Sequence, residues 1–408
     1  MKNIIVGQSG GPTAVINASI AGVYKKAKEL GIEHVYGMVH GIEGFLNEDI
    51  IDLDEYLNNQ DNYELLKRTP SAFLGSCRYK LPKIEGNEET YEKIFNILEK
   101  HEIDALFYAG GNDSMDTIKM LSDYAKDHNK PQRFMGVPKT IDNDLPITDH
   151  CPGYGSSAKY IATSLKEIIR DNASFGKSRL TVCIVEIMGR HAGWLTASAA
   201  LAKDDSCEGV DAIYLPETPF DIDEFIERVK KLSETKESIV IAVSEGVQTS
   251  DGKFVCELGS DEKAVDAFGH KQLSGCATTL ANIVSERLGF KTRAIEFSTL
   301  QRAASHIASL TDINEAEEAG AKAVDEANNG KTGMMAILKR VNNNPYTCET
   351  DVYDIHDIAN VEKKVPLEWI DNDNKQMNKE FIDYVKPLIQ GELTPIYKDG
   401  LPVHLIRK

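Results

Sequence analysis

The chain has 408 residues, of which 41% are hydrophobic, so it is long and apolar enough for two globular domains of ordinary size. Its formal net charge is −18 and no run of lysine or arginine stands out, which disfavours a nucleic acid or an anionic membrane as a partner. Seven scattered cysteines without a C-x-x-C pair disfavour a disulfide framework and a zinc site. We recognise no signal peptide and no apolar run of the roughly 18 residues that span a bilayer, and we expect a cytoplasmic protein.

The first predicted element is a short strand over residues 3–6, followed by the turn Gly10-Gly11 and a helical pattern through residues 16–27. A strand, a glycine turn and a helix together present backbone N–H groups to an anion. A plain tight turn is an equally good interpretation of this segment. Further along, Arg78 follows a turn of small residues at 75–77, where it either reaches inward or is simply solvated.

A second glycine turn follows the apolar strand predicted over residues 105–108. It contains Gly110 and Gly111, which allow a phosphate to approach, and then Asn112, Asp113 and Ser114, which open a helix. Asn112 and Asp113 offer oxygen ligands to a metal, and Ser114 is a candidate N-cap. The alternative is that Asp113 and Ser114 do nothing more than cap the helix.

The most informative stretch is the loop between Pro138 and Pro146, which follows an apolar run over residues 134–137. It holds Lys139, Thr140, Asp142 and Asp144. Open α/β sheets place their chemistry in loops at the carboxyl ends of strands, and one lysine with two carboxylates suits a phosphoryl group, a metal and a general base. A surface turn is the alternative, because Asp, Asn and Pro are ordinary turn formers. The two glycine turns and this loop are expected to share one edge of a sheet.

The second half of the chain repeats the alternation of strands and helices. Strands are predicted over residues 180–185, 211–215, 238–243 and 291–297, and helices over 155–171, 220–232 and 275–288. Met188, Gly189 and Arg190 follow the first of these strands, and Glu245 follows the third. The pattern predicts two Rossmann-like, three-layer α/β/α domains with mostly parallel sheets.

Taken together, these motifs resemble those of the phosphofructokinase family in order and spacing, over residues 3 to about 305. The resemblance is carried by Gly10, Gly11, residues 73–78, residues 110–114, residues 138–144, Met188, Gly189, Arg190, Glu245, Arg293, Gln301 and Arg302. It implies the phosphofructokinase fold and transfer of a phosphoryl group to the 1-hydroxyl of fructose 6-phosphate. It also implies a donor and Mg²⁺ domain over residues 1–150 with a returning segment near 303–345, a sugar domain over 151–302, and a C-terminal extension over 346–408. From Asn342 onward, the sequence predicts irregular packing with short helices.

The resemblance also assigns roles to individual residues. Asp142 is implied as the general base, assisted by Lys139, Thr140 and Arg78. The donor is expected to contact Gly10, Gly11, Gly110, Gly111, Asp113 and Ser114. Mg²⁺ is expected at Asn112 and Asp144. Fructose 6-phosphate is expected to contact Thr140, Asp142, Asp144, Met188, Gly189, Arg190 and Glu245, with Arg293 and Arg302 at its 6-phosphate. Because one sugar-phosphate arginine of this family crosses a subunit boundary, the resemblance implies a homodimer or homotetramer with shared active sites.

The phosphoryl donor is indicated by two residues, Asp113 and Lys139, which stand where ATP-dependent members carry glycine. Asp113 would repel the α-phosphate of a nucleotide, and Lys139 would place a cation beside a small, highly charged donor. The pair therefore resembles the pyrophosphate-dependent branch. The alternatives are an ATP-dependent 6-phosphofructokinase, a non-catalytic phosphate-sensing subunit, and a lipid or NAD kinase.

The chain departs from the family pattern at a few positions. Asn112 replaces a metal-linked aspartate, and Thr299 replaces a common histidine near the sugar phosphate. Thr181 stands where many members carry the arginine supplied by a neighbouring subunit, and Arg179 is a candidate substitute. Ala21 replaces an effector-site arginine of allosteric bacterial members, so we expect no strong effector control.

Overall fold

The computed structural model describes residues 1–175, 180–259 and 275–407, which form two compact units. The first unit comprises Met1–Ser156, Arg302–Glu362 and Leu388–Lys408, and the second comprises Ser157–Gln301 and Lys363–Pro387. Residues 346–408 are thus divided between the two units and do not form a unit of their own. Among the described helices, none combines the length and the apolar character that a membrane span requires.

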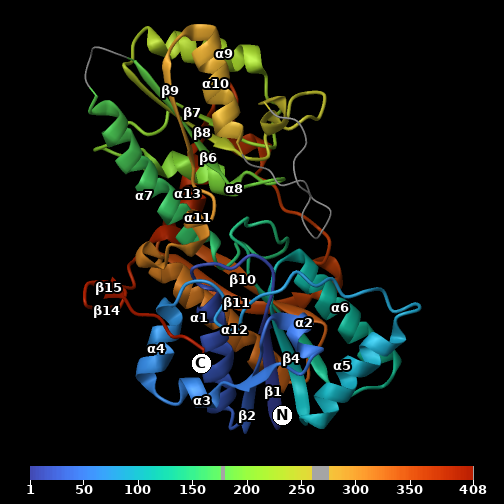
Figure 1. The fold of residues 1–408 in the computed structure, drawn as a ribbon. Helices are drawn as coiled ribbons and strands as arrows, with labels where there is room; N and C mark the ends of the chain where they lie inside the picture. Colours follow the sequence, from blue (N-terminus) through green and yellow to red (C-terminus); the bar gives the residue numbers. More distant parts are fainter. Residues whose placement is uncertain (176–179, 260–274, 408) are drawn as a thin grey trace. The chain divides into compact units, whose positions relative to one another are not determined.

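The first unit is built on a seven-stranded sheet in the order β11-β10-β5-β4-β1-β2-β3 (Figure 1). Five strands run parallel, and the two edge strands β3 and β11 run antiparallel to their neighbours. The strands are β1 (Asn3–Gln8), β2 (His34–Met38), β3 (Ile50–Asp52), β4 (Ile103–Gly110), β5 (Arg133–Pro138), β10 (Met334–Asn343) and β11 (Tyr346–Asp354). The helices are α1 (Ile16–Glu29), α2 (Gly41–Phe45), α3 (Asp54–Leu57), α4 (Gln60–Arg68), α5 (Glu88–Lys100), α6 (Asn112–Asp127) and α12 (Leu310–Asn328).

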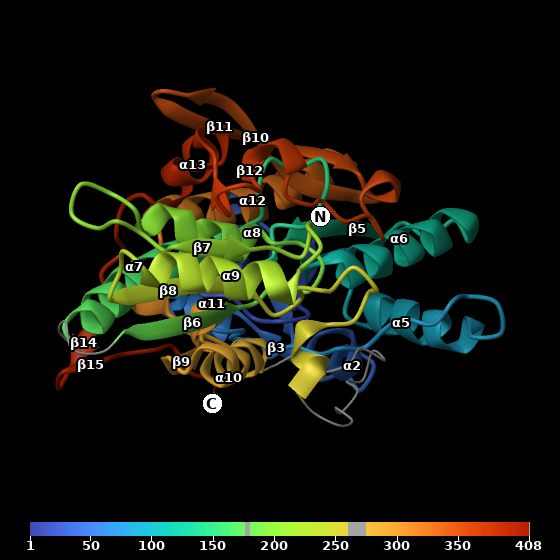
Figure 2. The same ribbon diagram turned by 90° about the horizontal axis from the view of Figure 1, so that it is seen from above.

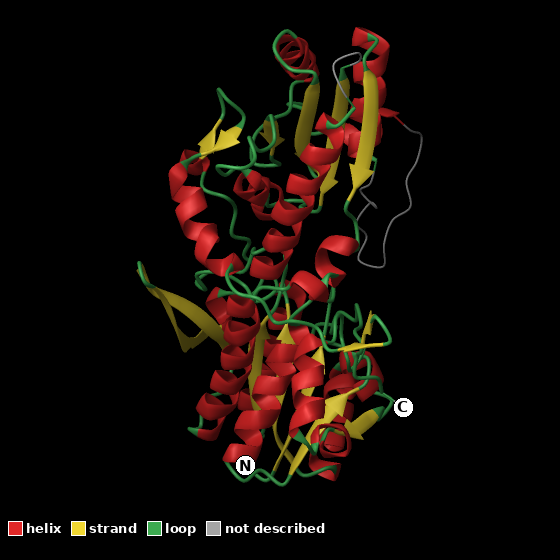
Figure 3. Ribbon diagram, turned by 90° about the vertical axis from the view of Figure 1, so that its left-hand side faces the viewer, coloured by secondary structure: helices red, strands yellow, loops and turns green. Residues whose placement is uncertain are grey.

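Helices cover both faces of this sheet (Figure 3). Alternate residues of β1 point to opposite faces, as in any strand, so that Ile4 packs with α1 and α12 while Ile5 packs with α5 and α6. Helices α1 and α12 touch backbone to backbone. A Cβ atom on Gly22 would lie only 1.9 Å from the carbonyl oxygen of Glu317, and one on Gly320 would lie 2.1 Å from that of Ser19. Both positions therefore need glycine.

The topology of the first sheet places a switch point between β1 and β4. The chain continues from β1 to β2 on one side and returns to β4 on the other side of β1. In open parallel sheets, ligands bind in the crevice outside the carboxyl ends of the strands at such a point. The Gly10-Gly11 turn, the Gly110-Gly111 turn and the loop after Pro138 follow β1, β4 and β5, which are adjacent in the sheet.

The second unit has a four-stranded parallel sheet in the order β7-β8-β6-β9. Helices α9 and α10 pack beside each other on this sheet, around a core that includes Phe225 and Leu280 (Figure 2). Its strands are β6 (Thr181–Ile187), β7 (Ala212–Tyr214), β8 (Ser238–Ser244) and β9 (Lys291–Glu296). Its helices are α8 (Trp194–Ala197), α9 (Ile222–Ser233), α10 (Cys276–Leu288) and α13 (Lys379–Val385), while α7 (Tyr154–Ala173) and α11 (Leu300–Ala303) span the unit boundaries.

The C-terminal part of the chain contributes to both units. In the second unit, Trp194 donates from its indole Nε1 to the carbonyl oxygen of Lys363 at 2.9 Å, and its ring packs near those of Trp369 and Tyr384. The short pair β12 (Ile370–Asp371) and β13 (Gln376–Met377) belongs to this segment. In the first unit, the chain ends with a second short pair, β14 (Tyr397–Lys398) and β15 (Leu401–Pro402).

Two local predictions about secondary structure were wrong. Ser114 is not the N-cap of α6, because its backbone N–H donates to the carbonyl oxygen of Gly111 at 3.0 Å and Gly111 caps the helix. The tail after Asn342 is not irregular at its start, because β11 completes the edge of the first sheet. A half-exposed edge strand lacks the continuous apolar run of a central strand, so its sequence signal is weak.

Candidate active site

Backbone hydrogen bonds join the loops at the carboxyl edge of the first sheet. The N–H of Lys139 donates to the carbonyl oxygen of Gly110 at 3.0 Å. The N–H of Gly10 donates to the carbonyl oxygen of Cys77 at 3.1 Å, and the hydroxyl of Ser76 donates to the carbonyl oxygen of Gly10 at 2.6 Å. The two glycine turns and the central loop therefore follow adjacent strands, as predicted, and the segment before Arg78, which follows no strand, joins them.

The glycine turn after β1 makes room for two cations. Gly10 has φ +73°, a conformation that side chains other than glycine rarely adopt, and a Cβ atom there would lie 3.4 Å from Nζ of Lys139. A Cβ atom on Gly11 would lie 3.2 Å from Nη1 of Arg302. The Nζ of Lys139 donates to the carbonyl oxygen of Gly11 at 2.6 Å. Two cationic groups thus lie directly against this turn, where they can attract an anion.

Lys139 is almost completely buried, with 3% of its surface exposed. Burial lowers the pKa of its ammonium group to about 8, although the charges of Asp142 and Asp144 act in the opposite direction. The nearby charge of Arg302 lowers the pKa further. The lysine remains mostly protonated near neutral pH and carries its charge in a place where solvent screens it weakly.

Two guanidinium groups complete a cationic cluster with Lys139. Burial and the charge of Arg78 lower the pKa of Arg302, whereas Asp142 raises it. The Nε atom of Arg302 is buried and has no hydrogen-bond partner among the described residues. Arg78 itself is exposed. Like charges held close together and an unsatisfied donor favour an anion at this position.

Among the carboxylates of this edge, Asp142 has the pKa best suited to a general base. Burial raises its pKa to about 7, the charge of Asp144 raises it as well, and Lys139 and Thr140 oppose the rise. The hydroxyl of Thr140 lies 3.5 Å from Oδ2 of Asp142 and accepts from the backbone N–H of Asp142 at 3.0 Å. A base whose pKa lies near neutral pH matches the requirement for proton abstraction from a hydroxyl group.

Two buried oxygen atoms in this region lack hydrogen-bond partners among the described residues. They are Oδ1 of Asn112, at the start of α6, and Oδ1 of Asp144. Burial also raises the pKa of Asp144. A buried acceptor without a donor is unfavourable unless something else binds it, and amide and carboxylate oxygens are the ligands that hard divalent cations prefer. The two residues predicted to bind metal therefore fit such a cation.

Asp113 and Ser114 occupy different surroundings on the first turn of α6. The side chain of Asp113 is exposed. Ser114 is buried against the glycine turn, and a Cβ atom on Gly110 would lie 1.9 Å from the Oγ of Ser114. Ser114 therefore requires glycine at 110, and Asp113 remains available to whatever approaches this edge.

The second unit brings four of the predicted sugar-binding residues together. Met188, Gly189 and Arg190 follow β6, and Glu245 follows the adjacent strand β8. The N–H of Gly189 donates to Oε1 of Glu245 at 3.4 Å. Gly189 has φ +143°, and a Cβ atom there would lie 2.7 Å from a carbonyl oxygen, so this turn depends on glycine.

Arg293 does not join that group within the second unit. It lies opposite Cys183 in the middle of the β9–β6 pair, four residues before the end of β6. Its Nη1 lies 3.2 Å from Oδ2 of Asp171, and its guanidinium group stacks 4.4 Å from the ring centroid of Phe175. It lines a cavity of about 410 Å³. Arg302 belongs to the first unit, so the predicted pairing of these arginines on one phosphate stays a prediction.

The sequence profile of phosphofructokinase matches residues 3–327. This chain belongs to the phosphofructokinase family. It is 41% identical over 403 residues to the pyrophosphate–fructose 6-phosphate 1-phosphotransferase of Methylococcus capsulatus, which covers 98% of this chain and 94% of that protein. The solved structure of the pyrophosphate-dependent phosphofructokinase from Nitrosospira multiformis matches with a TM-score of 0.88 and 39% identity, over 98% of this chain and 95% of that one. The corresponding structure from Marinobacter aquaeolei has a TM-score of 0.88 and 38% identity, over 100% and 98%. The predicted family and α/β fold class are confirmed.

Two further residues of this phosphofructokinase support the site, although the sequence had assigned them no role in it. Asn143 has φ +53° and accepts from the backbone N–H of Cys151 at 2.9 Å through Oδ1, and it stands between the two site carboxylates. Asparagine tolerates this left-handed conformation better than most residues, which was the available signal. Gln301 accepts from the N–H of Met188 at 3.3 Å. Of the predicted departures, Thr181 is buried and Arg179 lies outside the described residues.

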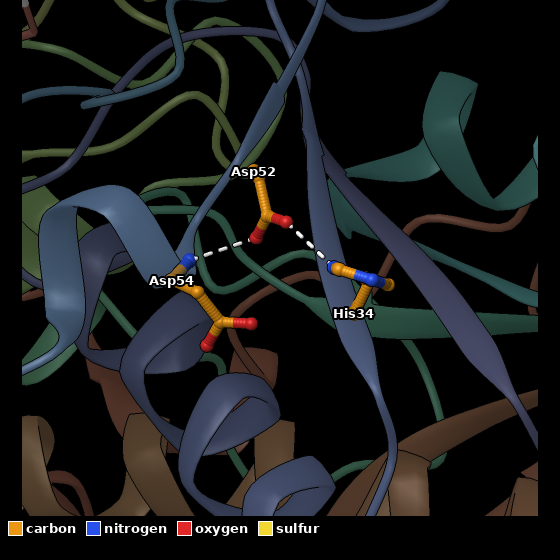
Figure 4. A group of neighbouring side chains, drawn as sticks. All are labelled: His34, Asp52 and Asp54. Atoms are coloured by element: carbon orange, nitrogen blue, oxygen red, sulfur yellow. Dashed lines mark hydrogen bonds and ion pairs between the residues drawn. The ribbon is translucent and has the colours of Figure 1, made fainter.

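A separate group of metal-ligating residue types lies at the opposite edge of the first sheet (Figure 4). His34, the first residue of β2, faces Asp52, whose Oδ2 lies 2.7 Å from Nδ1 of the imidazole. Asp54 already pairs with Nζ of Lys28 at 2.6 Å and accepts from the hydroxyl of Tyr24 at 2.8 Å. Because a cation would have to displace Lys28, we interpret this group as a network of surface ion pairs.

Proposed function

We propose that this phosphofructokinase transfers a phosphoryl group from pyrophosphate to the 1-hydroxyl of fructose 6-phosphate, giving fructose 1,6-bisphosphate and phosphate. The observation that carries the proposal is the position of Lys139. It is a buried cation against the glycine turn, next to a carboxylate whose pKa is raised to about 7. The names of the curated relatives, at 36–41% identity over nearly the whole chain, support the same reaction. The reaction runs in both directions, in glycolysis and gluconeogenesis.

The residues of the first unit divide the chemistry between them. Asp142 takes the proton of the attacking hydroxyl, and Thr140 orients its carboxylate. Lys139 and Arg78 balance the negative charge of the phosphoryl group and of the leaving phosphate. A loose phosphoryl-transfer transition state needs positioned cations more than covalent chemistry, and buried cations serve better than exposed ones.

The donor is held by the two glycine turns. Gly10, Gly11, Gly110 and Gly111 carry no side chains and so let a phosphate approach the backbone of both turns closely, and Ser114 holds the second turn in place. Pyrophosphate has no base or ribose to bind, so charge must supply the affinity, and Lys139 supplies it. Discrimination against ATP also needs a repulsive element, and the exposed carboxylate of Asp113 at the first turn of α6 provides it.

The metal is Mg²⁺, held by Asn112 and Asp144. The two unsatisfied oxygen atoms of these side chains support this assignment. When bound, the cation neutralises phosphate oxygens of the donor. Asn112 contributes no charge, so Asp144 provides the only formal charge of the pair.

The sugar is bound by Met188, Gly189, Arg190 and Glu245 of the second unit, with its 6-phosphate on Arg293 and Arg302. The enzyme is a cytoplasmic homodimer or homotetramer in which active sites are shared. The position of Arg293, which lies apart from the other sugar residues of its own unit, supports a contribution to a neighbouring subunit.

The experiment that tests the proposal is a donor panel with fructose 6-phosphate and pyrophosphate, ATP or polyphosphate. The wild type is expected to be active with pyrophosphate and nearly silent with ATP, and to form pyrophosphate from fructose 1,6-bisphosphate and phosphate. Asp113→Gly is expected to admit some ATP activity, and Lys139→Gly to impair mainly the use of pyrophosphate. A wild-type preference for ATP would overturn the donor assignment and leave the role of Asp142 standing.

A further inference from the structure

The segment that follows the central loop, residues 148–150, is anchored to β10 of the first sheet. The backbone N–H of Leu338 donates to the hydroxyl oxygen of Thr148 at 3.0 Å, and the N–H of Asp149 donates to the carbonyl oxygen of Leu338 at 2.9 Å. The hydroxyl of Thr148 in turn donates to the carbonyl oxygen of His150 at 2.8 Å. Residues 148–150 thus extend the sheet locally and lead the chain back towards the loop that carries Asp142.

His150 is buried at the centre of an ionic cluster, with 1% of its surface exposed. Its Nδ1 lies 2.8 Å from Oδ2 of Asp149, and its Nε2 lies 2.6 Å from Oε2 of Glu315 on α12. Arg340 of β10 donates to the same Oδ2 of Asp149 at 3.0 and 3.1 Å, and the hydroxyl of Tyr346 on β11 donates to Oε1 of Glu315 at 2.5 Å. Both ring nitrogens can donate only when the imidazole is protonated.

The charges in this cluster balance when His150 is protonated. Burial alone would lower its pKa, but the charges and hydrogen bonds of Glu315 and Asp149 raise the pKa to about 9. Two cations, His150 and Arg340, then face two carboxylates. Removing one member leaves a buried charge without compensation, and this strongly destabilises a folded protein.

A short path of hydrogen bonds connects the cluster to the site carboxylates. The N–H of Cys151, the residue after His150, donates to Oδ1 of Asn143 at 2.9 Å. Asn143 is fully buried and stands between Asp142 and Asp144. The N–H of Thr140 donates to the carbonyl oxygen of Pro152 at 3.3 Å. Both ends of the carboxylate-bearing segment therefore rest on residues 151 and 152.

We propose that His150 is a positioning residue for phosphoryl transfer. Its ring, clamped between Asp149 and Glu315, fixes residues 150–152, and these fix the orientation of Asp142 and Asp144 through Asn143 and Thr140. The inference rests on the proposed function of Asp142, although His150 itself touches no substrate. A misplacement of about 1 Å at a reacting group costs up to about 10²-fold in rate. The clamp therefore acts on turnover more than on substrate affinity.

The test uses His150→Gln and a matched control, His356→Gln. His356 also bridges two carboxylates, Asp354 at 2.7 Å and Asp123 at 2.9 Å, but it is about half exposed and is not linked to the loop. We expect His150→Gln to lower kcat by about tenfold or more, with both substrate KM values within about threefold of wild type. We expect His356→Gln to match the wild type. A folded His150→Gln enzyme with kcat within about twofold of wild type overturns the proposal.

Charge compensation separates positioning from simple packing. Glu315→Gln keeps the shape of the partner side chain and removes its charge. If the clamp works through charge balance, each single variant loses turnover and the double variant His150→Gln/Glu315→Gln recovers most of the loss. If His150 only fills space, the double variant is at least as impaired as either single variant. Glu315→Gln carries the test by itself should His150→Gln fail to fold.

Hydrogen exchange tests the inference independently of which phosphoryl donor the enzyme uses. Peptides covering residues 139–147 are expected to exchange faster in His150→Gln than in wild type or His356→Gln, while peptides from α5 stay unchanged. Unchanged exchange in 139–147 contradicts the proposal whatever the activity. If the panel shows that the wild type uses another donor, kcat is compared with that donor. The proposed function then fails, and the positioning role is still tested.

Discussion

Replacing Asp142 with asparagine is expected to make the protein more stable while it removes most of its activity. A rise of the Asp142 pKa from 3.8 to about 7 corresponds to about 4 kcal/mol of unfavourable ionisation in the folded state. The folded protein keeps the proton at pH values at which the unfolded chain has lost it. Stability therefore falls as the pH rises from about 4 to about 7 and is constant above that range. Asparagine cannot ionise and escapes this loss.

The expected gain at pH 8 is smaller than that upper bound. Asp142 keeps some contact with solvent, and Lys139 loses a favourable charge when Asp142 is neutralised. We expect the Asp142→Asn variant to unfold with a free energy about 1–3 kcal/mol above that of wild type. Turnover should fall by about 10²–10⁴, the usual effect of removing a general base.

Denaturant unfolding at two pH values provides the assay. At pH 5.5 the Asp142 carboxyl is largely protonated in the folded wild type but largely ionised in the unfolded chain. About half of the difference in unfolding free energy between Asp142→Asn and wild type at pH 8 should therefore be lost at pH 5.5. Comparing the difference across pH avoids relying on absolute values for a chain with two units. Asp113→Asn, which alters an exposed carboxylate of the same unit, is the matched control variant. A variant less stable than wild type at pH 8, or a difference independent of pH, refutes the reasoning.

Three other predictions concern rate, affinity and assembly. The acidic limb of the kcat/KM profile should lie near pH 7, because Asp142 must be ionised to act as the proposed base. Asp144→Asn should move this limb to lower pH, and Lys139→Gly should move it to higher pH. Shifts of the same sign in both variants would assign the limb to another group. Arg302→Lys should raise the KM for fructose 6-phosphate and leave that for pyrophosphate nearly unchanged, since lysine cannot reproduce a bidentate phosphate contact; the reverse pattern would reassign the residue. Light scattering should show a dimer or a larger assembly, and an active monomer would exclude shared active sites.

The central part of the fold and the place of the site were predictable from sequence because buried strands carry strong signals. Strand β4 has one exposed residue in eight, so its apolar run is nearly continuous and ends at Gly110. The neighbouring strands β1 and β5 are also buried, and they end at Gln8 and Pro138, just before the other two loops of the site. Since parallel strands end at one edge, three polar loops after three adjacent strands had to meet there.

The edges and the ionic details were not predictable, because they depend on register and on contacts distant in the chain. Strand β11 consists mostly of exposed and half-buried residues, and within the described part of the chain it pairs only with β10. The family resemblance groups Arg293 with the other sugar-binding residues. The register of β9, however, places Arg293 opposite Cys183. The clamp on His150 joins residues up to 165 positions apart, and no local pattern reports such a contact.

An enzyme with a negative net charge that binds anionic substrates needs buried cations. Burial limits the screening of these cations by solvent and separates them from the negative charges of the surface. The net charge of −18 would repel pyrophosphate over the whole surface, yet salt screens exposed charges beyond about 10 Å. Inside the edge of the first sheet, burial acts on Lys139 and Asp142 in opposite senses, lowering one pKa to about 8 and raising the other to about 7. Each charge partly restores the other, so that near neutral pH Lys139 is mostly protonated while Asp142 is about half ionised. A dense anion that enters there meets weakly screened cations, while the proposed base, Asp142, is still weak enough to release the proton when the reaction runs backwards.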